Sequence, residues 1–152
     1  MGIFIDFSKA FDTVNHTILL QKPCHYGVNC KELNWFKSYL TNRQQCVKLN
    51  TVISGYLPVT CGVSQGSILG PMLFLIYVNE LPNILKQLNT ILHADDTNLF
   101  YNSKPFSQET LDALNKDLGI FYQCTVTNKL TLNFSKTHAM TVPEIPACQT
   151  AK

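Results

Sequence analysis

The 152-residue chain lacks the long apolar run of a membrane protein and the basic leader of a secreted one. Its longest apolar run, residues 72–78, is far below the ~18 residues that a membrane-spanning helix requires. The N-terminal apolar run is interrupted by Asp6, which also stands where N-myristoylation requires Ser or Thr. We therefore expect an intracellular protein of the cytoplasm or nucleus, with no signal peptide and no membrane contact.

The sequence also lacks cysteines spaced as metal ligands and a strong positive charge. The six cysteines form no Cys-x-x-Cys pair and no zinc-ligand spacing with the four histidines, so we expect reduced, mostly buried thiols. A formal net charge of +2 is not the strong basic footprint of an independent nucleic-acid-binding domain. Any contact with nucleic acid should be local. The length and the 45% of hydrophobic residues suit one globular domain.

Two adjacent carboxylates stand where two apolar, strand-like runs meet. Residues 91–100 predict a hairpin with Asp95 and Asp96 as its tight turn, because Asp tolerates the backbone of turns. Two acids at a hairpin tip repel each other, and divalent cations that bind carboxylate oxygens relieve this repulsion. An ordinary solvated turn is the alternative interpretation of this pair.

A third carboxylate, Asp6, ends an apolar, β-prone run near the start of the chain. Burying an acid in such a run is costly unless a charge compensates it. If this strand lies beside the hairpin, a strand spacing of about 4.8 Å brings Asp6 within reach of the same ions as Asp95 and Asp96. Three such carboxylates can hold two Mg²⁺ or Mn²⁺ ions roughly 3.5–4 Å apart, which stabilise both oxygens of an in-line displacement at phosphorus.

Four ordered segments add a resemblance to these patterns. They are residues 4–14 (FIDFSKAFDTV), 62–71 (GVSQGSILGP), 93–96 (HADD) and 133–137 (NFSKT). In order and spacing they resemble the successive motifs of reverse transcriptases from non-LTR, LINE-type retrotransposons, over residues 2–142. The resemblance implies an α+β fold, the polymerase palm, with a small antiparallel sheet covered by helices on one face. Residues 143–152 are expected to form a tail.

The function implied by this resemblance is RNA-directed DNA polymerisation. Two metal ions would assist nucleotidyl transfer from a dNTP to the 3′-hydroxyl of a DNA primer on an RNA template. The implied catalytic residues are Asp6, Asp95, Asp96 and Lys136, of which the three acids hold the metal and the lysine protonates the pyrophosphate. The implied substrate-binding residues are Phe11, which excludes a 2′-hydroxyl, and Gln65 and Gly66, which support the new base pair.

Several of these residues have a plainer alternative. Phe11 also suits a core aromatic, and Lys136 a surface lysine. His93 stands where relatives carry Tyr or Phe, so packing near the primer end is favoured over a role as metal ligand. Two interpretations are open for Arg43 and Lys48: contact with a phosphate backbone, or ordinary surface cations.

Helical spacing and β-prone runs predict the supporting elements. Helices are expected over residues 16–26 with a break at Pro23, over 32–40 against a sheet, over 68–81 buried nearly all round, and over 109–121. Residues 122–127 are expected to disrupt the last helix, because three poor helix formers follow one another there. A hairpin is expected around residues 50–51 and a strand over 130–134. Asp12 is expected to cap a helix and Trp35 to lie in the core.

The resemblance also defines an alternative function. Related polymerases have a fingers subdomain before the first acid strand and a thumb after the lysine motif, and neither is recognised in this sequence, so the grip on substrate would come from elsewhere. Pro23, Ser64, His93 and residues 122–127 depart from the family pattern. We therefore expect the isolated chain to be inactive, and a folded or partly folded, catalytically inactive remnant of such an element, with at most weak binding, is the alternative.

Overall fold

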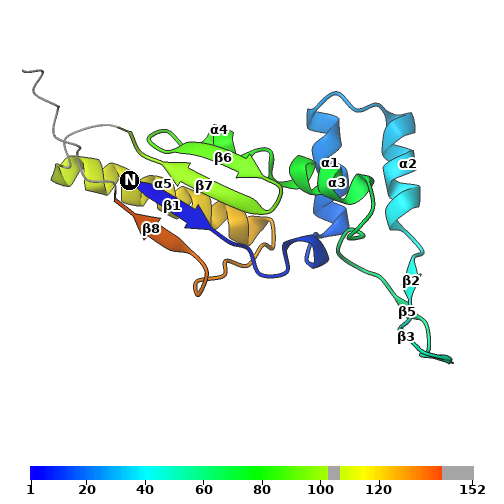
Figure 1. The fold of residues 1–152 in the computed structure, drawn as a ribbon. Coiled ribbons are helices and arrows are strands. Elements are labelled where there is room, and N and C mark those ends of the chain that lie inside the picture. The colour runs from blue at the N-terminus through cyan, green and yellow to red at the C-terminus, as the bar shows by residue number, and fades with distance from the viewer. Residues whose placement is uncertain (103–106, 142–152) are drawn as a thin grey trace, which may run out of the picture.

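The computed structural model describes residues 1–102 and 107–141 and has an α+β fold, as predicted (Figure 1). The expected tail lies outside the described residues. The helical elements are η1 (Ala10–Asp12), α1 (His16–His25), α2 (Cys30–Leu40), α3 (Leu69–Val78), α4 (Leu81–Ile84) and α5 (Gln108–Thr127). The strands are β1 (Gly2–Ile5), β2 (Gln44–Gln45), β3 (Lys48–Leu49), β4 (Val52–Ile53), β5 (Leu57–Pro58), β6 (Asn89–His93), β7 (Asp96–Phe100) and β8 (His138–Met140). No helix within the described ranges has both the length and the hydropathy needed to cross a membrane.

The main sheet is antiparallel, with strand order β6-β7-β1-β8. The N-terminal strand therefore lies beside the acidic hairpin, which is the neighbour that the sequence predicts for it. The fourth strand is β8, so the prediction of a strand over residues 130–134 is wrong. Leu132 forms only an isolated bridge with Phe7. The amides of Lys136 and Thr137 both donate to the carbonyl of Asn133, and this turn separates the bridge from β8.

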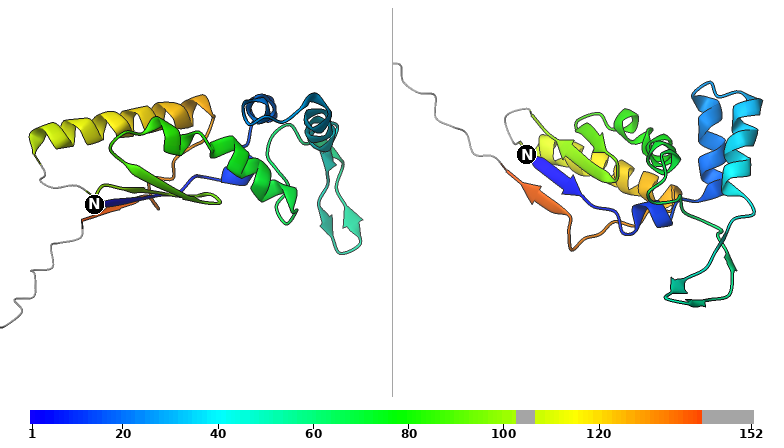
Figure 2. Two further views of the ribbon diagram at one scale, coloured as in Figure 1. Left: turned by 90° about the horizontal axis from the view of Figure 1, so that it is seen from above. Right: turned by 45° about the vertical axis from the view of Figure 1, so that its right-hand side comes forward.

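Helix α5 covers one face of the sheet, and no helix of residues 1–102 and 107–141 covers the other, bare face (Figure 2). On the covered face, Ile5 and Leu99 are buried in one apolar core with Phe121 of α5. On the bare face, the rings of Phe4 and Phe100 meet edge to face, 6.0 Å apart. This face carries the end of the sheet where the acids lie, so the helices support the site from behind.

The predicted disruption of the last helix at residues 122–127 is wrong, because α5 continues to Thr127. The hydroxyls of Thr125 and Thr127 donate to the carbonyls of Tyr122 and Gln123, one turn earlier. Thr125 is also fully buried. Packing of this turn against the core outweighs the low helix propensity of its residues, which amounts to only a few tenths of a kcal/mol each.

Pro23 does not break its helix as predicted, since α1 continues to His25. Pro23 lies in the last turn, so little helix follows the hydrogen bond that it removes. Asn15 caps the start of α1 by accepting a hydrogen bond from the amide of Ile18 at 3.1 Å. The prediction that Asp12 caps this helix is therefore wrong.

Helix α2 packs against α1 and not against a sheet, contrary to the prediction. Phe36 and Leu40 fill the contact, whereas Trp35 is 54% exposed and is not a core residue. The Trp35 ring packs beside Phe36 and Tyr39 on the surface of α2. The apolar stripe of α2 is narrow, so one packed neighbour is enough to bury it.

The apolar run at residues 68–81 forms two helices, α3 and α4, where one was predicted. Pro82 lies in the first turn of α4, where its missing amide costs nothing. Phe74 and Tyr77 are fully buried, but Met72 and Leu75 are each 43% exposed, so α3 is not buried all round.

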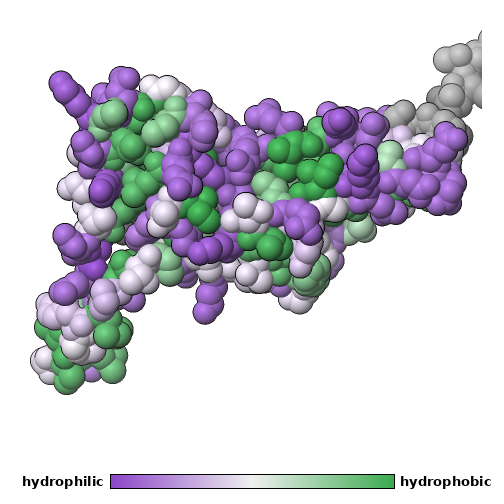
Figure 3. Space-filling model, turned by 180° about the vertical axis from the view of Figure 1, so that it is seen from behind, coloured by the Kyte–Doolittle hydropathy of each residue, from purple (hydrophilic) through white to green (hydrophobic). Residues whose placement is uncertain are grey.

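Strands β2 to β5 form an arm that projects from the rest of the molecule (Figures 1 and 2). Asn50 has φ 54° at its tip, which confirms the predicted hairpin there. Figure 3 shows apolar residues on this arm. Its exposed large apolar side chains are Val47, Leu49, Val52, Ile53, Tyr56 and Leu57.

The cysteines of the described residues are free thiols, as predicted, but most are not buried. Cys24, Cys30, Cys46 and Cys61 are exposed, since they lie on thin parts of the fold: the helix pair and the projecting arm. Cys124 is half-buried, and burial together with the nearby Glu80 carboxylate raises the pKa of its thiol to about 11.

The buried ammonium of Lys22 joins α1 to Glu80, which lies between α3 and α4. Lys22 is buried and its Nζ lies 2.7 Å from Oε1 of Glu80, which also accepts a hydrogen bond from Asn128 at 2.7 Å. Burial alone would raise the pKa of Glu80, but the hydrogen bonds from Lys22 and Asn128 outweigh it and hold this pKa below its usual value. The ionised carboxylate compensates the buried ammonium, without which Lys22 would be strongly destabilising.

A buried carboxylate fixes the approach to the hairpin. Asp117 of α5 is only 3% exposed, and its Oδ2 accepts hydrogen bonds from three successive backbone amides, those of Lys86, Gln87 and Leu88, at 2.6–3.2 Å. These residues lead from α4 into β6. The contact therefore sets where the acidic hairpin begins.

We predict that Asp117→Ala lowers the free energy of unfolding by about 3–5 kcal/mol, because it leaves three inward-facing amides without an acceptor. Urea unfolding followed by circular dichroism measures the change. Asp112→Ala is the matched control, since Asp112 is an exposed acid on the same helix. Its effect should stay within about 0.5 kcal/mol. Equal effects of the two substitutions would contradict the anchoring role of Asp117.

Candidate functional site

Asp6 and Asp96 come together at one end of the main sheet. Ile5 and Thr97 are the last pair of β1 and β7, and Asp6 and Asp96 are the residues that adjoin this pair. His93 pairs with Asp96 across β6 and β7. Directly opposed residues project from the same face of a sheet. Asp96 and His93 therefore project from one face, the face that α5 leaves bare, and Asp6 follows β1 at the same end of the sheet.

The hairpin turn consists of Ala94 and Asp95, one residue earlier than predicted. Asp96 is the first residue of β7, and its pairing with His93 leaves only two residues for the turn. Ala94 has φ 54°, in the left-handed region, where a side chain costs roughly 1–2 kcal/mol. A positive φ at the first turn residue suits the twist of a two-residue hairpin. This backbone places Asp95 at the tip of the hairpin, next to Asp96 and at the same end of the sheet as Asp6.

The carboxylate of Asp6 is held by Asn133, whose Nδ2 donates to Oδ2 at 2.8 Å. The amide of Asn133 also donates to the carbonyl of Asp6 at 2.8 Å. Lys136 follows three residues later, in the turn between this contact and β8, and it is exposed. The fold thus brings the segment of the predicted catalytic lysine beside the first acid.

The described residues contain no group of three or more His, Cys, Asp or Glu placed to hold a metal ion. This arrangement is not an all-protein cage. Mg²⁺ is commonly bound by one or two carboxylates together with waters and substrate phosphates, so Asp6, Asp95 and Asp96 at one end of the sheet suit such a site. His93 is exposed at the same end, and its packing near a primer stays a prediction.

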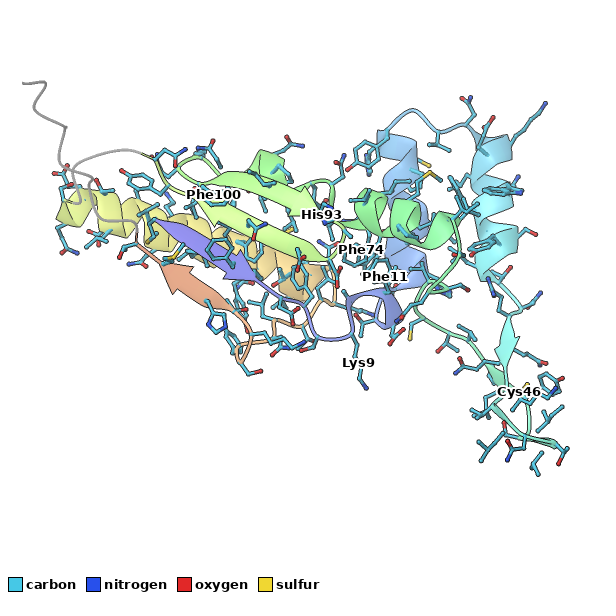
Figure 4. All side chains as sticks on the ribbon, in the orientation of Figure 1. Lys9, Phe11, Cys46, Phe74, His93 and Phe100 are labelled. Atoms are coloured by element: carbon cyan, nitrogen blue, oxygen red, sulfur yellow. The ribbon has the colours of Figure 1, made fainter. Side chains whose placement is uncertain are left out.

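Phe11 is half-buried, and its ring packs against that of Phe74 of α3 at 4.8 Å. The carbonyl of Phe11 accepts a hydrogen bond from the amide of Val63 at 2.8 Å. Figures 1 and 2 show η1, the turn that carries Phe11, at the same end of the sheet as the hairpin tip, and Figure 4 labels Phe11, Phe74 and His93 there. Phe11 is therefore partly a core residue, and the turn that carries it lies at the acidic end of the sheet.

The loop that carries Gln65 docks directly on η1. Nε2 of Gln65 donates to Oδ1 of Asp12 at 2.9 Å, and the amide of Gly62 donates to the carbonyl of Val14 at 2.8 Å. Gly62 has φ 85°, and a Cβ there would lie 2.8 Å from the carbonyl oxygen of Asp12. Gly66, with φ 78°, has open space around it. Gln65 and Phe11 therefore have fixed positions relative to each other.

A cavity of about 640 Å³ opens between η1, α2, the base of the projecting arm and this loop. Its lining includes the cations Lys9 and Arg43, with Asp12, Gln65 and Tyr39. The guanidinium of Arg43 lies 5.1 Å from the centre of the Tyr39 ring. The hydroxyl of Tyr39 hydrogen-bonds Ser67, which lowers the pKa of Tyr39 although burial opposes this. The cavity is thus a polar site lined by two cations and one carboxylate.

The structure adds Lys9, Tyr39 and Asn133 to the residues that the sequence analysis singled out for this site. Lys9 has φ 51°, an unusual backbone that turns the chain between β1 and η1. Its only signal in the sequence is its place inside the first motif. Asn133 likewise begins the last motif, but nothing in its spacing indicates a contact with Asp6. Lys48 lies on the arm and is exposed, outside the cavity lining.

The sheet end, the paired turns and the cavity together define an α+β protein with an acidic site beside a cationic pocket. A family model for "Reverse transcriptase (RNA-dependent DNA polymerase)" matches residues 1–150, so the chain belongs to this family. The resemblance seen in the four sequence segments is confirmed.

Three relatives from Drosophila melanogaster illustrate the similarity. The RNA-directed DNA polymerase from mobile element jockey is 30% identical over 149 residues, 90% of this chain and 15% of the relative. The probable RNA-directed DNA polymerase from transposon X-element is 33% identical over 107 residues, 68% of this chain and 12% of the relative. The corresponding protein from transposon BS is 34% identical over 115 residues, 67% and 12% respectively. The chain thus spans 12–15% of the length of these relatives.

We predict that Gly62→Ala destabilises the chain by about 2–4 kcal/mol, because the new methyl group strains a positive-φ backbone and also collides with the backbone of Asp12. Gly27→Ala is the matched control: Gly27 has φ 79° but nothing within 4 Å of the added Cβ. It should cost only about 1 kcal/mol. Urea unfolding of both variants measures the difference, and equal losses would show that η1 does not dock on the loop as described.

Proposed function

We propose that this chain forms the catalytic palm of an RNA-directed DNA polymerase over residues 2–142. The observation that supports the proposal is the pairing of β1 with β7, which brings Asp6 to the same end of the sheet as Asp95 and Asp96 in a chain of the reverse transcriptase family. The substrates would be an RNA template, a DNA primer and a dNTP. The bare face of the sheet leaves room for them at the acidic end.

Asp6, Asp95 and Asp96 would hold two Mg²⁺ or Mn²⁺ ions through carboxylate oxygens, with substrate phosphates completing the coordination. When bound, such ions stabilise the attacking 3′-oxygen and the leaving pyrophosphate oxygen. Lys136, which is exposed near Asp6, would donate a proton to the pyrophosphate. Because its side chain is exposed, Lys136 would contact the pyrophosphate only when substrate is bound.

Substrate recognition would fall to the two docked turns and the cavity. Gln65 and Gly66 would support the new base pair, since the exposed loop lets backbone approach a base closely. Lys9 and Arg43 would neutralise phosphate charge from the cavity lining. Phe11 would restrict space beside the sugar, because its contact with Phe74 prevents its ring from moving back.

A second candidate is a folded domain without catalytic activity. The absence of a three-ligand metal group among the described residues favours it. The two candidates differ in one result, the incorporation of dNTPs on an RNA template.

We predict that a chimera, in which a related polymerase supplies fingers and thumb to this chain, extends a DNA primer on an RNA template with Mn²⁺ or Mg²⁺, and that Asp95→Asn in it lowers the rate at least about 100-fold, because a lost metal ligand costs several kcal/mol in the transition state. A gel-based extension assay measures both rates. Asp112→Asn, an exposed acid on α5, should have the wild-type rate. A folded wild-type chimera that incorporates no nucleotide would favour the inactive domain, and incorporation unaffected by Asp95→Asn would exclude the proposed site.

Phe11→Ala should raise kcat/KM for ribonucleotides relative to deoxynucleotides at least about 10-fold, because it opens space beside the 2′-hydroxyl. Single-nucleotide incorporation by the chimera with matched dNTP and rNTP pairs measures the ratio. The wild-type ratio, measured in parallel, is the reference. If the substitution lowers both values equally, Phe11 acts only as a core residue against Phe74.

A further inference from the structure

Asn133 supplies the side-chain hydrogen bond that the structure records for the carboxylate of Asp6. The Nδ2···Oδ2 distance is 2.8 Å. An ionised carboxylate has no proton to donate, so it must face the NH₂ group of the Asn133 amide. The contact therefore fixes one of the two oxygens of Asp6 and leaves the other, Oδ1, with no hydrogen-bond partner recorded in residues 1–102 and 107–141.

The orientation of Asn133 is itself fixed from its other side. Oγ of Ser135 donates to Oδ1 of Asn133 at 2.7 Å. The backbone of Asn133 is held as well: its amide donates to the carbonyl of Asp6, and its carbonyl accepts hydrogen bonds from the backbone and the hydroxyl of Thr137. The amide of Asp6 in turn donates to the hydroxyl of Thr137 at 3.4 Å. Residues 133–137 thus hold Asp6 by main chain and side chain together.

We propose that Asn133 is a positioning residue for Asp6, which holds Oδ2 so that Oδ1 is free to bind a divalent cation. The inference rests on the proposed function, in which Asp6 is a metal ligand. A neutral amide suits this task, because it orients the carboxylate without adding a positive charge that would compete with the ion. Hydrogen-bond partners of metal ligands of this kind typically contribute 10–100-fold to metal affinity.

Asn133→Ala tests the inference, because it removes the amide and keeps the main-chain hydrogen bonds to Asp6. Mn²⁺ binding to the full chain is measured by electron paramagnetic resonance of the free ion, at a temperature where thermal unfolding without metal shows each variant to be folded. We expect Mn²⁺ affinity to fall at least about 10-fold in Asn133→Ala. Asn34→Ala, an exposed asparagine on α2, is the matched control and should bind as wild type.

Two further variants separate this inference from the proposed function. Asp6→Asn should remove the Mn²⁺ binding that Asn133→Ala weakens. Ser135→Ala keeps the Asn133 side chain but frees its rotation, so a weakening of a few-fold is expected, and it serves as the test if Asn133→Ala does not fold. A purely structural role of Asn133 would lower thermal stability without changing the Mn²⁺ affinity of the folded chain.

The outcomes are distinct. Mn²⁺ binding that is lost in Asp6→Asn and weakened in Asn133→Ala supports the inference. Binding that is lost in Asp6→Asn but equal in wild type and Asn133→Ala overturns the positioning role and leaves the proposed function intact. No binding in the wild type, or full binding in Asp6→Asn, overturns the proposed metal site and the inference with it.

Discussion

The antiparallel register between β1 and β7 is the constraint on which the candidate site depends. Because Ile5 pairs with Thr97, Asp6 and Asp96 reach the same end of the sheet, and a slip of one residue would turn every side chain of β1 to the opposite face. Apolar burial enforces this register. Ile5 and Leu99 belong on the side of α5, so the acids must project from the bare side. The core thus determines the position of the chemistry.

Buried polar contacts fix the remaining elements around this register. Asp117 anchors the segment that leads into β6. The ion pair of Lys22 and Glu80 joins α1 to the segment between α3 and α4. Each contact holds groups that would be costly to bury alone, so it specifies one arrangement of the helices. On the opposite side, Asn133 reaches Asp6 from the segment before β8. The three acids are therefore held by β1, by the hairpin of β6 and β7, and by Asn133.

The second part of the site depends on close backbone contact. Gly62 allows the loop with Gln65 to lie against the backbone of Asp12, and this contact brings Gln65 and Phe11 to one end of the sheet. The cavity with Lys9 and Arg43 opens on the outer side of the same turns. In the proposed function, the acids at the sheet end would bind metal ions and the cations of the cavity would meet phosphates. Such an arrangement suits a substrate that carries phosphates.

The sequence by itself determined the class of fold, the strand that carries Asp6, the hairpin of Asp95 and Asp96, and membership of the reverse transcriptase family. These follow from local apolar patterns and from motifs whose order survives in the chain. Only the tertiary structure decided that the turn is Ala94 and Asp95, that α5 continues through residues 122–127, that β8 closes the sheet, and that Trp35 is exposed. The physical reason is that such features depend on packing between distant segments, which outweighs local propensity by a few kcal/mol and leaves no periodic trace in the sequence.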